Sequence, residues 1–325
     1  MTLEDWGVSN FEFVKTLDIL QNCSNFVSCG LAEEIITKEY KKYSSEIIDV
    51  LVHRLQLDSK LKILNQIFFL TEVTFIDLLV LKVEALFKFP LPILATKIEQ
   101  LLAIEYSNFF HTNETPFCAL NFCSDEVNKF AFGKWRSISI TAPEFPPVFY
   151  ILFSKDSLVF FKDVFAFLLS LKQVLSTLQE NWRSARNSAN REDARKVDPF
   201  WIQRWRMTHF AEQLFLYLTE DVLRFHFEKF TSNVNNKDSV DDIKNSYEIF
   251  LNVTKTQLFL CKIHITNTLA ELFECCHKFC SSTSVEKRKE AGEGFNKQYR
   301  LLLRILNGLK NSTETGVSLL LERIN

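Results

Sequence analysis

The sequence predicts an all-α protein of stacked helical bundles, with one irregular insertion and a short extended segment. Three observations carry this prediction. Hydrophobic residues make up 47% of the 325 residues, which is enough for a substantial core. Only seven glycines and seven prolines interrupt the chain, too few for the turns of an all-β protein. Long segments repeat their apolar residues at helical spacing.

Residues 1–106 predict an N-terminal helical bundle. The span 11–60 is expected to form two or three helices, and its clearest amphipathic run is LAEEIITKEYKKYSSEIIDVLVHRLQL. The helical pattern continues through LKILNQIFFLTEVTFIDLLVLKVEALF and is broken at Pro90 and Pro92. A further helix is predicted over ILATKIEQLLAIEY, which ends at Tyr106.

Residues 107–140 predict an irregular insertion or linker, because the helical period is lost between 107 and 133. After Trp135, Ile138 and Ile140 alternate with polar residues. This alternation predicts a short extended segment at the end of the insertion.

Residues 141–325 predict the C-terminal helical bundles. A proline cluster precedes a long aromatic helix over 155–181, and a polar, basic loop over 183–199 follows it. After the next helix, the run from DSVDDIKN to CCHKFC predicts two helices with no obvious breaker between them. Two shorter helices are expected after a polar break at 281–294.

The helix over 204–230 is apolar on two faces. One stripe at helical spacing comprises Met207, Phe210, Ala211, Leu214, Leu218, Val222 and Phe225. A second face carries Leu216, Leu223, Phe227 and Phe230. Such a helix is either the centre of a large core or, in part, a binding face for another protein.

Composition argues against two kinds of partner. The formal net charge is −2 and the charges are well mixed, so no nucleic-acid-binding face is predicted. The most apolar window, 75–94, contains four charged residues and two prolines, so membrane insertion is not predicted. The first residues, MTLEDWGVSNFEF, are acidic and lack a signal-peptide pattern. We therefore expect a cytoplasmic protein.

Motifs for catalysis, cofactors or metals are not apparent in the sequence. It has no glycine-rich phosphate loop, no nucleophile elbow and no metalloprotease spacing, so neither an enzyme nor a cofactor is predicted. The eight cysteines are scattered, which predicts reduced thiols. In CCHKFC, Cys276 and Cys280 share a helical face, but the apolar surroundings favour core packing over a zinc site.

The start of the 204–230 helix is a candidate partner-binding surface. The candidate residues are Trp201, Arg204, Trp205, Arg206 and Met207. Trp and Arg are enriched at the energetic centres of protein interfaces. A helix-capping and core role for these residues is an equal alternative.

A series of motifs runs in order through the chain. It comprises Trp135 before the extended segment, Pro146–Pro147, a long helix ending at Trp182, the helix start WIQRWRM, Asp221–Val222, Phe250–Leu251 and LAELFECCHKFC. Over roughly residues 60–325 this order resembles the C-terminal grip domain of the gamma-tubulin complex component family, and the short fourth-type members most. The chain departs from the family pattern at Val73–Thr74 and at Tyr247.

The resemblance implies a non-enzymatic protein that binds gamma-tubulin and other gamma-tubulin complex components. Such components support microtubule nucleation at microtubule-organising centres, namely the centrosome or spindle pole, during spindle assembly. Family members carry a preceding half that makes lateral contacts, and we expect most of it to be missing here. Two alternatives stay open: a helical tethering or adaptor protein with a non-tubulin partner, and an enzyme whose site assembles from distant residues.

Overall fold

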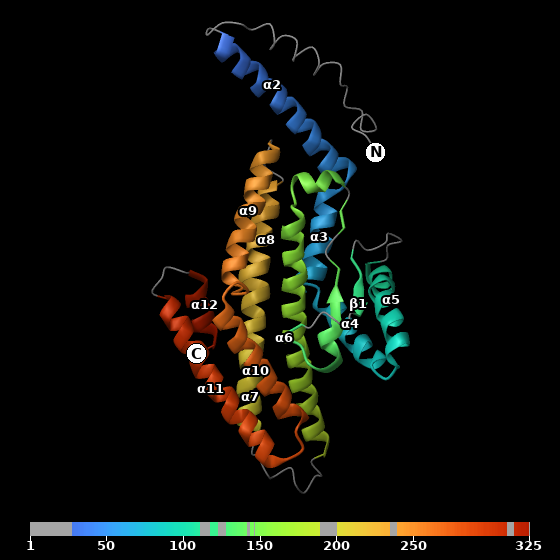
Figure 1. Cartoon of the computed structure of the whole chain (residues 1–325), viewed down its shortest axis with the longest axis vertical. Coiled ribbons are helices and arrows are strands. Elements are labelled where there is room, and N and C mark those ends of the chain that lie inside the picture. Colours follow the sequence, from blue (N-terminus) through green and yellow to red (C-terminus); the bar gives the residue numbers. More distant parts are fainter. Residues whose placement is uncertain are drawn as a thin grey trace.

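The computed structural model shows an elongated, almost wholly helical molecule (Figure 1). The described residues are 28–110, 118–122, 128–141, 144–145, 147–188, 200–234, 239–310 and 315–324. Among them, one two-stranded sheet is the only β structure. The all-α prediction is confirmed.

The elements follow the chain from the α2 end to the C-terminal helices. The helices are α2 (Ser28–Asp49), η2 (Val50–Arg54), α3 (Leu57–Phe68), α4 (Val73–Leu86), α5 (Leu91–Phe110), η3 (Gly133–Ser137), η4 (Pro147–Ile151), α6 (Lys155–Ser188), α7 (Trp201–Leu216), η6 (Tyr217–Arg224), α8 (Phe225–Val234), α9 (Val240–Gln257), α10 (Ile263–Ser281), α11 (Val285–Lys310) and α12 (Thr315–Ile324).

The two strands lie in the predicted insertion. Strands β1 (Leu120–Phe122) and β2 (Ile138–Ile140) pair antiparallel, with Leu120 opposite Ile140. The inward side chains of β2 are buried and β2 packs on α6. The short extended segment predicted at Ile138–Ile140 is therefore present.

Two helices extend beyond their predicted ends. Helix α5 reaches Phe110, because Phe109 packs on Phe75 with ring centroids 5.4 Å apart. Helix α6 reaches Ser188, into the span expected to be a basic loop, since Arg and Ala sustain a helix without an apolar stripe. The rest of that loop, 189–199, lies outside the described residues, as do residues 1–27.

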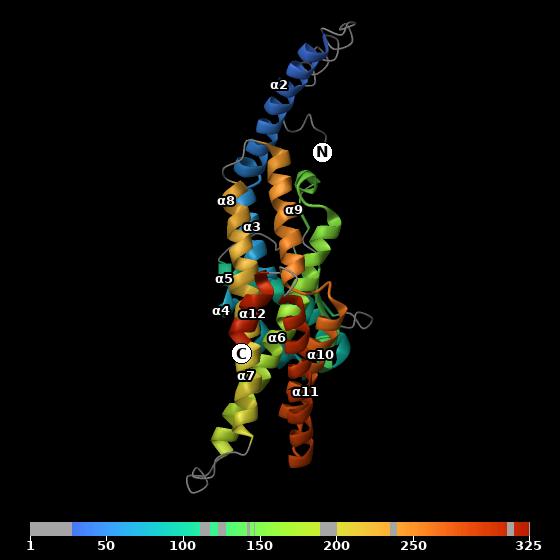
Figure 2. The same cartoon turned by 90° about the vertical axis from the view of Figure 1, so that its left-hand side faces the viewer.

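A column of long helices forms the body of the molecule (Figures 1 and 2). Helix α6 packs against α3, α7 and α10, while α7, η6 and α8 form one continuous helix beside it. Helices α4 and α5 and the sheet lie on one side of this column, and α11 and α12 lie on the other. Helix α2 projects beyond the column at one end.

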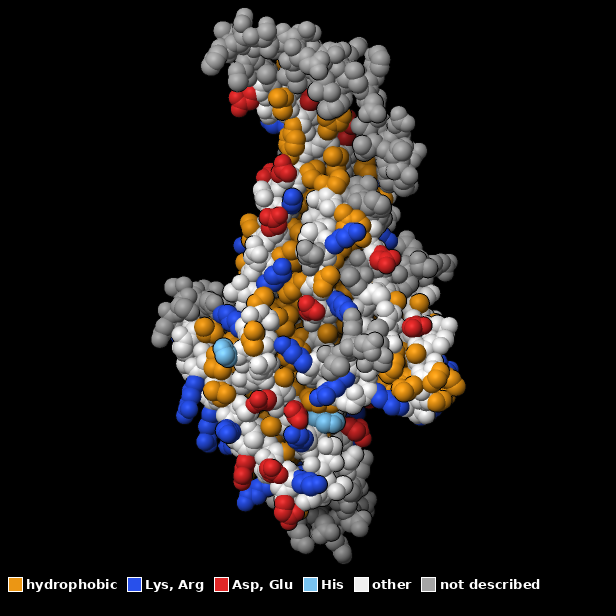
Figure 3. Space-filling model, in the orientation of Figure 1, with side chains coloured by type: hydrophobic (Ala, Val, Ile, Leu, Met, Phe, Trp, Pro, Cys, Tyr) orange, Lys and Arg blue, Asp and Glu red, His pale blue; other side chains and the backbone are white. Residues whose placement is uncertain are grey.

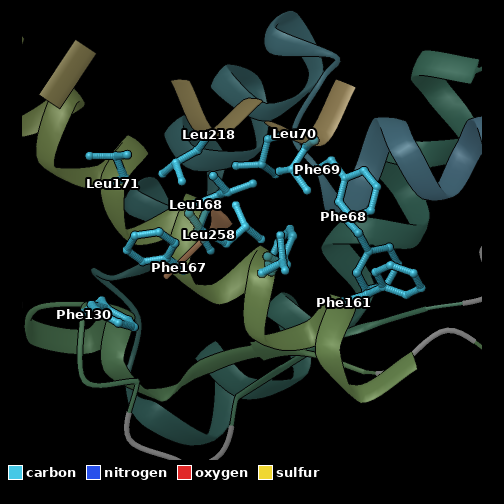
Figure 4. Packing of buried hydrophobic residues seen from close by; sticks show 14 of the residues in the cluster. Phe68, Phe69, Leu70, Phe130, Phe161, Phe167, Leu168, Leu171, Leu218 and Leu258 are labelled. Atoms are coloured by element: carbon cyan, nitrogen blue, oxygen red, sulfur yellow. The ribbon is translucent and has the colours of Figure 1, made fainter. Parts of the chain in front are cut away.

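Phenylalanine side chains join the helices at the centre of the column. Phe69, at the end of α3, lies 5.5 Å from Phe161 of α6, 5.6 Å from Phe227 of α8 and 6.1 Å from Phe250 of α9, measured between ring centroids. Figure 4 shows Phe68, Phe69 and Phe161 within this cluster. Aromatic pairs of this kind add about 0.5–1.5 kcal/mol each beyond the burial of their area. The phenylalanine-rich composition thus builds one shared core.

Non-glycine residues in the left-handed region mark three helix boundaries in the described chain. Gln56, Leu70 and Phe259 have φ angles of 51°, 52° and 60°. Phe259 forms the break between α9 and α10 that the sequence pattern does not reveal. Its ring is buried 6.2 Å from the ring of Tyr217. Burial of such a ring stabilises the fold by about 1.5–3 kcal/mol, which offsets a backbone cost of about 1–2 kcal/mol.

The continuous helix from α7 to α8 changes register at η6, which is a π-helix. Phe225, placed on the first stripe by its spacing, is 59% exposed, and Leu216 of the second face is 40% exposed. A π-helical turn holds more residues than an α-helical turn, so the residues that follow it are rotated out of the α-helical phase. Leu223 and Phe227 face the core instead.

This register change explains why one helix is apolar on two faces. Its α7 part packs against α6 and α12, and its α8 part packs against α3 and α9. The helix therefore lies at the centre of the core for most of its length.

Candidate interaction surface

Tryptophan side chains are exposed at the end of the column that lies opposite α2 (Figure 1). Trp182, near the end of α6, is 48% exposed, and Trp201 and Trp205, at the start of α7, are 42% and 56% exposed. Ile202, between them, is 53% exposed. We call Trp182, Trp201, Ile202 and Trp205 the tryptophan end. Large apolar side chains gathered outside the core are a mark of binding surfaces.

Arg204 supports this end from inside. It is only 3% exposed, and its Nε donates a hydrogen bond of 2.9 Å to Oδ1 of Asn181 on α6. Its guanidinium lies 5.7 Å from the ring of Trp182. Asn181 in turn donates from Nδ2 to the backbone oxygen of Cys280 on α10, at 3.3 Å. Arg204 and Asn181 thus hold α6, α7 and α10 together beneath the exposed rings.

The structure divides the predicted surface residues into two groups. Trp201, Trp205 and Arg206 are exposed and available to a partner. Arg204 and Met207 are buried, so the core role left open by the sequence is the one they have in this structure. The sequence prediction did not include Trp182 or Ile202. Trp182 sits in a polar stretch without a helical stripe, and an isolated tryptophan there was the only available signal.

A groove with a volume of about 400 Å³ runs beside Trp205, between α7 and α11. The ring of Trp205 stacks on that of His209, with centroids 5.3 Å apart. Opposite them, Phe295 and Tyr299 of α11 stack with centroids 5.8 Å apart. Phe210 lies beneath, 5.8 Å from Phe295 and 5.6 Å from Tyr299. The groove therefore has aromatic walls and a packed apolar floor.

Close packing of α7 on α11 holds this groove in shape. The amide of Asn296 donates from Nδ2 to Oε1 of Gln203 at 3.2 Å. At Gly292 the two helices approach so closely that an added Cβ would lie 3.1 Å from Cγ of Gln203. Glycine at this position permits the close approach.

The CCHKFC segment is part of the packed core of α10. Cys276 is 2% exposed, and burial raises its thiol pKa. Burial also raises the pKa of Cys280 to about 12, which disfavours the thiolate that a metal would need. The ring of His277 stacks on Phe132 with centroids 4.7 Å apart, and burial lowers its pKa. Across the described ranges, no three His, Cys, Asp or Glu side chains are grouped for a metal ion.

Membrane insertion was not predicted from the sequence. Of the helices in the described part of the chain, none combines the length and apolar character needed to cross a bilayer.

The fold and the tryptophan end together define an all-α bundle protein with a candidate surface for binding another protein. Residues 144–325 match the family model described as gamma tubulin complex component C-terminal. This match covers more than half of the chain, and the chain belongs to the gamma-tubulin complex component family. The resemblance seen in the order of the motifs is confirmed, although the matched region begins later than residue 60.

Curated relatives agree with this assignment. The chain is 29% identical to gamma-tubulin complex component 4 of both Mus musculus and Homo sapiens over 176 residues, which are 50% of this chain and 26% of each relative. It is 25% identical to spindle pole body component alp4 of Schizosaccharomyces pombe over 145 residues, or 42% of this chain and 18% of the relative. The chain thus spans about a quarter or less of the length of these relatives.

Proposed function

We propose that this chain is a non-enzymatic component of a gamma-tubulin complex and that it binds gamma-tubulin through the tryptophan end. Its place in the cell would be the cytoskeleton, at a microtubule-organising centre. Two curated relatives are named gamma-tubulin complex component 4 and a third is named a spindle pole body component. Family membership supports the role, and the exposed tryptophans at one end of the column carry the choice of surface.

The surface suits a protein that works by positioning a partner. A stable interface buries about 800 Å² on each partner, with a few Trp, Tyr and Arg residues contributing most of the binding free energy. Trp201 and Trp205 lie one helical turn apart and present their rings together. The contact of Arg204 with Asn181 joins the helices beneath them, so little ordering would be lost on binding. A tubulin held in this way would support microtubule nucleation without any chemical step.

Co-purification with gamma-tubulin, with alpha/beta-tubulin as the control, tests the function. We expect selective binding at one to one. The double variant Trp201→Ala and Trp205→Ala should weaken binding more than tenfold, because truncated interface centres typically cost 2 kcal/mol or more. Phe225→Ala is the matched control, since this ring is 59% exposed on another part of the same helix and should leave binding unchanged.

The outcomes separate the function from the surface. Selective binding that ignores both tryptophan substitutions would retain the function and reject the tryptophan end. A folded chain that fails to bind gamma-tubulin would reject the function and favour an adaptor with another partner.

A further inference from the structure

The groove between α7 and α11 is bordered by positive charge. Arg206 lies on its α7 side and Arg300 on its α11 side. A shallow hollow next to it on α11 is lined by Lys297, Arg300 and Arg304. These three residues are three and four positions apart, so they share one face of the helix. Figure 3 shows Lys and Arg side chains gathered at the left edge of the molecule, where α11 lies.

These cations are not neutralised by their neighbours. Within the described ranges, none of Arg206, Lys297, Arg300 and Arg304 forms an ion pair, and Glu293 is the one carboxylate among the residues lining the groove and the hollow. Arg224 behaves differently, because Glu220 and Glu228 accept from it at 2.9 and 3.1 Å. The rim of the groove thus keeps a local positive charge on a chain whose net charge is −2.

The floor of the groove is apolar and already occupied by rings that pack on each other. Phe210, Phe295 and Tyr299 contact one another, and the Tyr299 hydroxyl donates to the backbone oxygen of Ile324. Leu303 and Ile324 complete the apolar lining. This lining favours an aliphatic or aromatic side chain entering from outside over a nucleotide base, which would need a free ring face on which to stack.

We propose that the α7–α11 groove is a second binding site, for a short acidic segment of another protein that carries an apolar anchor. The anchor would lie over Tyr299 and Leu303. Carboxylates on either side of it would accept hydrogen bonds from Arg206 and Arg300, whose planar guanidinium groups suit two-point contact with a carboxylate. The proposal goes beyond gamma-tubulin binding and does not depend on it.

Fluorescence anisotropy with a labelled synthetic peptide tests the site directly. The probe has eight residues, of which six are glutamate and the two in the middle are leucine and phenylalanine. We expect saturable binding to the full chain in the absence of gamma-tubulin. The double variant Arg206→Glu and Arg300→Glu should weaken it at least tenfold. A probe with both apolar residues replaced by serine should also bind at least tenfold more weakly.

The matched control makes the same charge change elsewhere on α11. Lys287 and Lys289 are exposed near the start of this helix and do not line the groove. The variant Lys287→Glu and Lys289→Glu should bind the probe within twofold of the unchanged chain. Because every substituted side chain is exposed, all variants should keep the same urea midpoint.

Three results would overturn the proposal. The control pair could weaken binding as much as the groove pair, which would mean diffuse electrostatic attraction. The serine probe could bind as well as the apolar probe, which would remove the role of the floor. A single-stranded oligonucleotide could bind the groove more tightly than the peptide, which would assign a different class of partner.

Discussion

Arg204 and Arg206 are two positions apart on α7 and have opposite surroundings. Successive helical residues are about 100° apart, so two positions turn a side chain to nearly the other side of the helix. Arg204 faces α6 and donates to Asn181, whereas Arg206 lies on the wall of the α7–α11 groove. At the scale of the residue, the same side chain stabilises the bundle at one position and is available for binding at the other.

Replacing Arg204 by leucine should destabilise the protein by about 2 kcal/mol. The change leaves the buried amide oxygen of Asn181 without its donor, and such a loss costs about 1–3 kcal/mol. Arg206→Leu makes the same chemical change on the surface and should shift stability by less than about 0.5 kcal/mol. Urea unfolding followed by circular dichroism measures both, and equal midpoints would show that Arg204 does not hold the helices together.

At the scale of the element, polar contacts seat whole helices on the column. Arg323 of α12 donates to Asp221 of η6 from Nε and an Nη atom, at 2.5 and 2.9 Å. Ser44 of α2 accepts from the backbone nitrogen of Val240 at 2.9 Å, and this caps the start of α9. The cap comes from a distant helix because the side chain of Ser239 makes no capping bond.

Close packing seats α12 as firmly as the ion pair does. A Cβ added at Gly316 would lie 2.8 Å from the hydroxyl oxygen of the buried Tyr217, so the fit requires glycine. Gly316→Ala should therefore cost about 1–3 kcal/mol through overpacking. The control is Gly308→Ala in α11, where nothing lies within 4 Å and alanine should stabilise the helix by up to about 1 kcal/mol.

Differential scanning calorimetry of the two alanine variants distinguishes these effects. The midpoint temperature should fall for Gly316→Ala and rise slightly for Gly308→Ala. A rise for both variants would mean that α12 adjusts freely on the column.

At the scale of the whole molecule, one continuous core contains ionisable groups that folding keeps neutral. Burial raises the pKa of the Cys118 thiol to about 12 and also raises that of Cys276. Burial likewise raises the pKa of Tyr247, whose hydroxyl donates to Ser157 Oγ at 2.8 Å. In the unfolded chain each of these groups ionises more readily, so their contribution to stability is complete below the unfolded pKa and is lost as the pH rises.

Stability should therefore fall between pH 8 and pH 11 under reducing conditions. With an unfolded thiol pKa near 8.5, each buried cysteine should account for a loss of about 1–2 kcal/mol by pH 10. Urea unfolding at pH 7.5 and pH 10 measures the total loss. The double variant Cys118→Ala and Cys276→Ala should be less stable at pH 7.5 but should lose less between the two pH values. An equal loss in both proteins would contradict this assignment.

The sequence was sufficient for properties that depend on nearby residues. Helical spacing predicted most helices, the alternation at Ile138 and Ile140 predicted the strand, and the order of motifs predicted the family. It was insufficient at Phe259, where a left-handed residue ends α9, because the ring contact with Tyr217 joins positions far apart in the chain. It was also insufficient at η6, since a π-helical turn leaves no separate mark in the apolar pattern.

The candidate surface shows the same division. The sequence by itself determined which side chains, Trp201, Trp205 and Arg206 among them, stand at the start of α7. Only the tertiary structure decided that Arg204 and Met207 are buried and that Trp182 joins the exposed rings. It also decided that Arg300 faces Arg206 across a groove. The physical reason is that a helix sets the direction of each side chain, whereas burial and charge depend on helices distant in the chain that pack beside it.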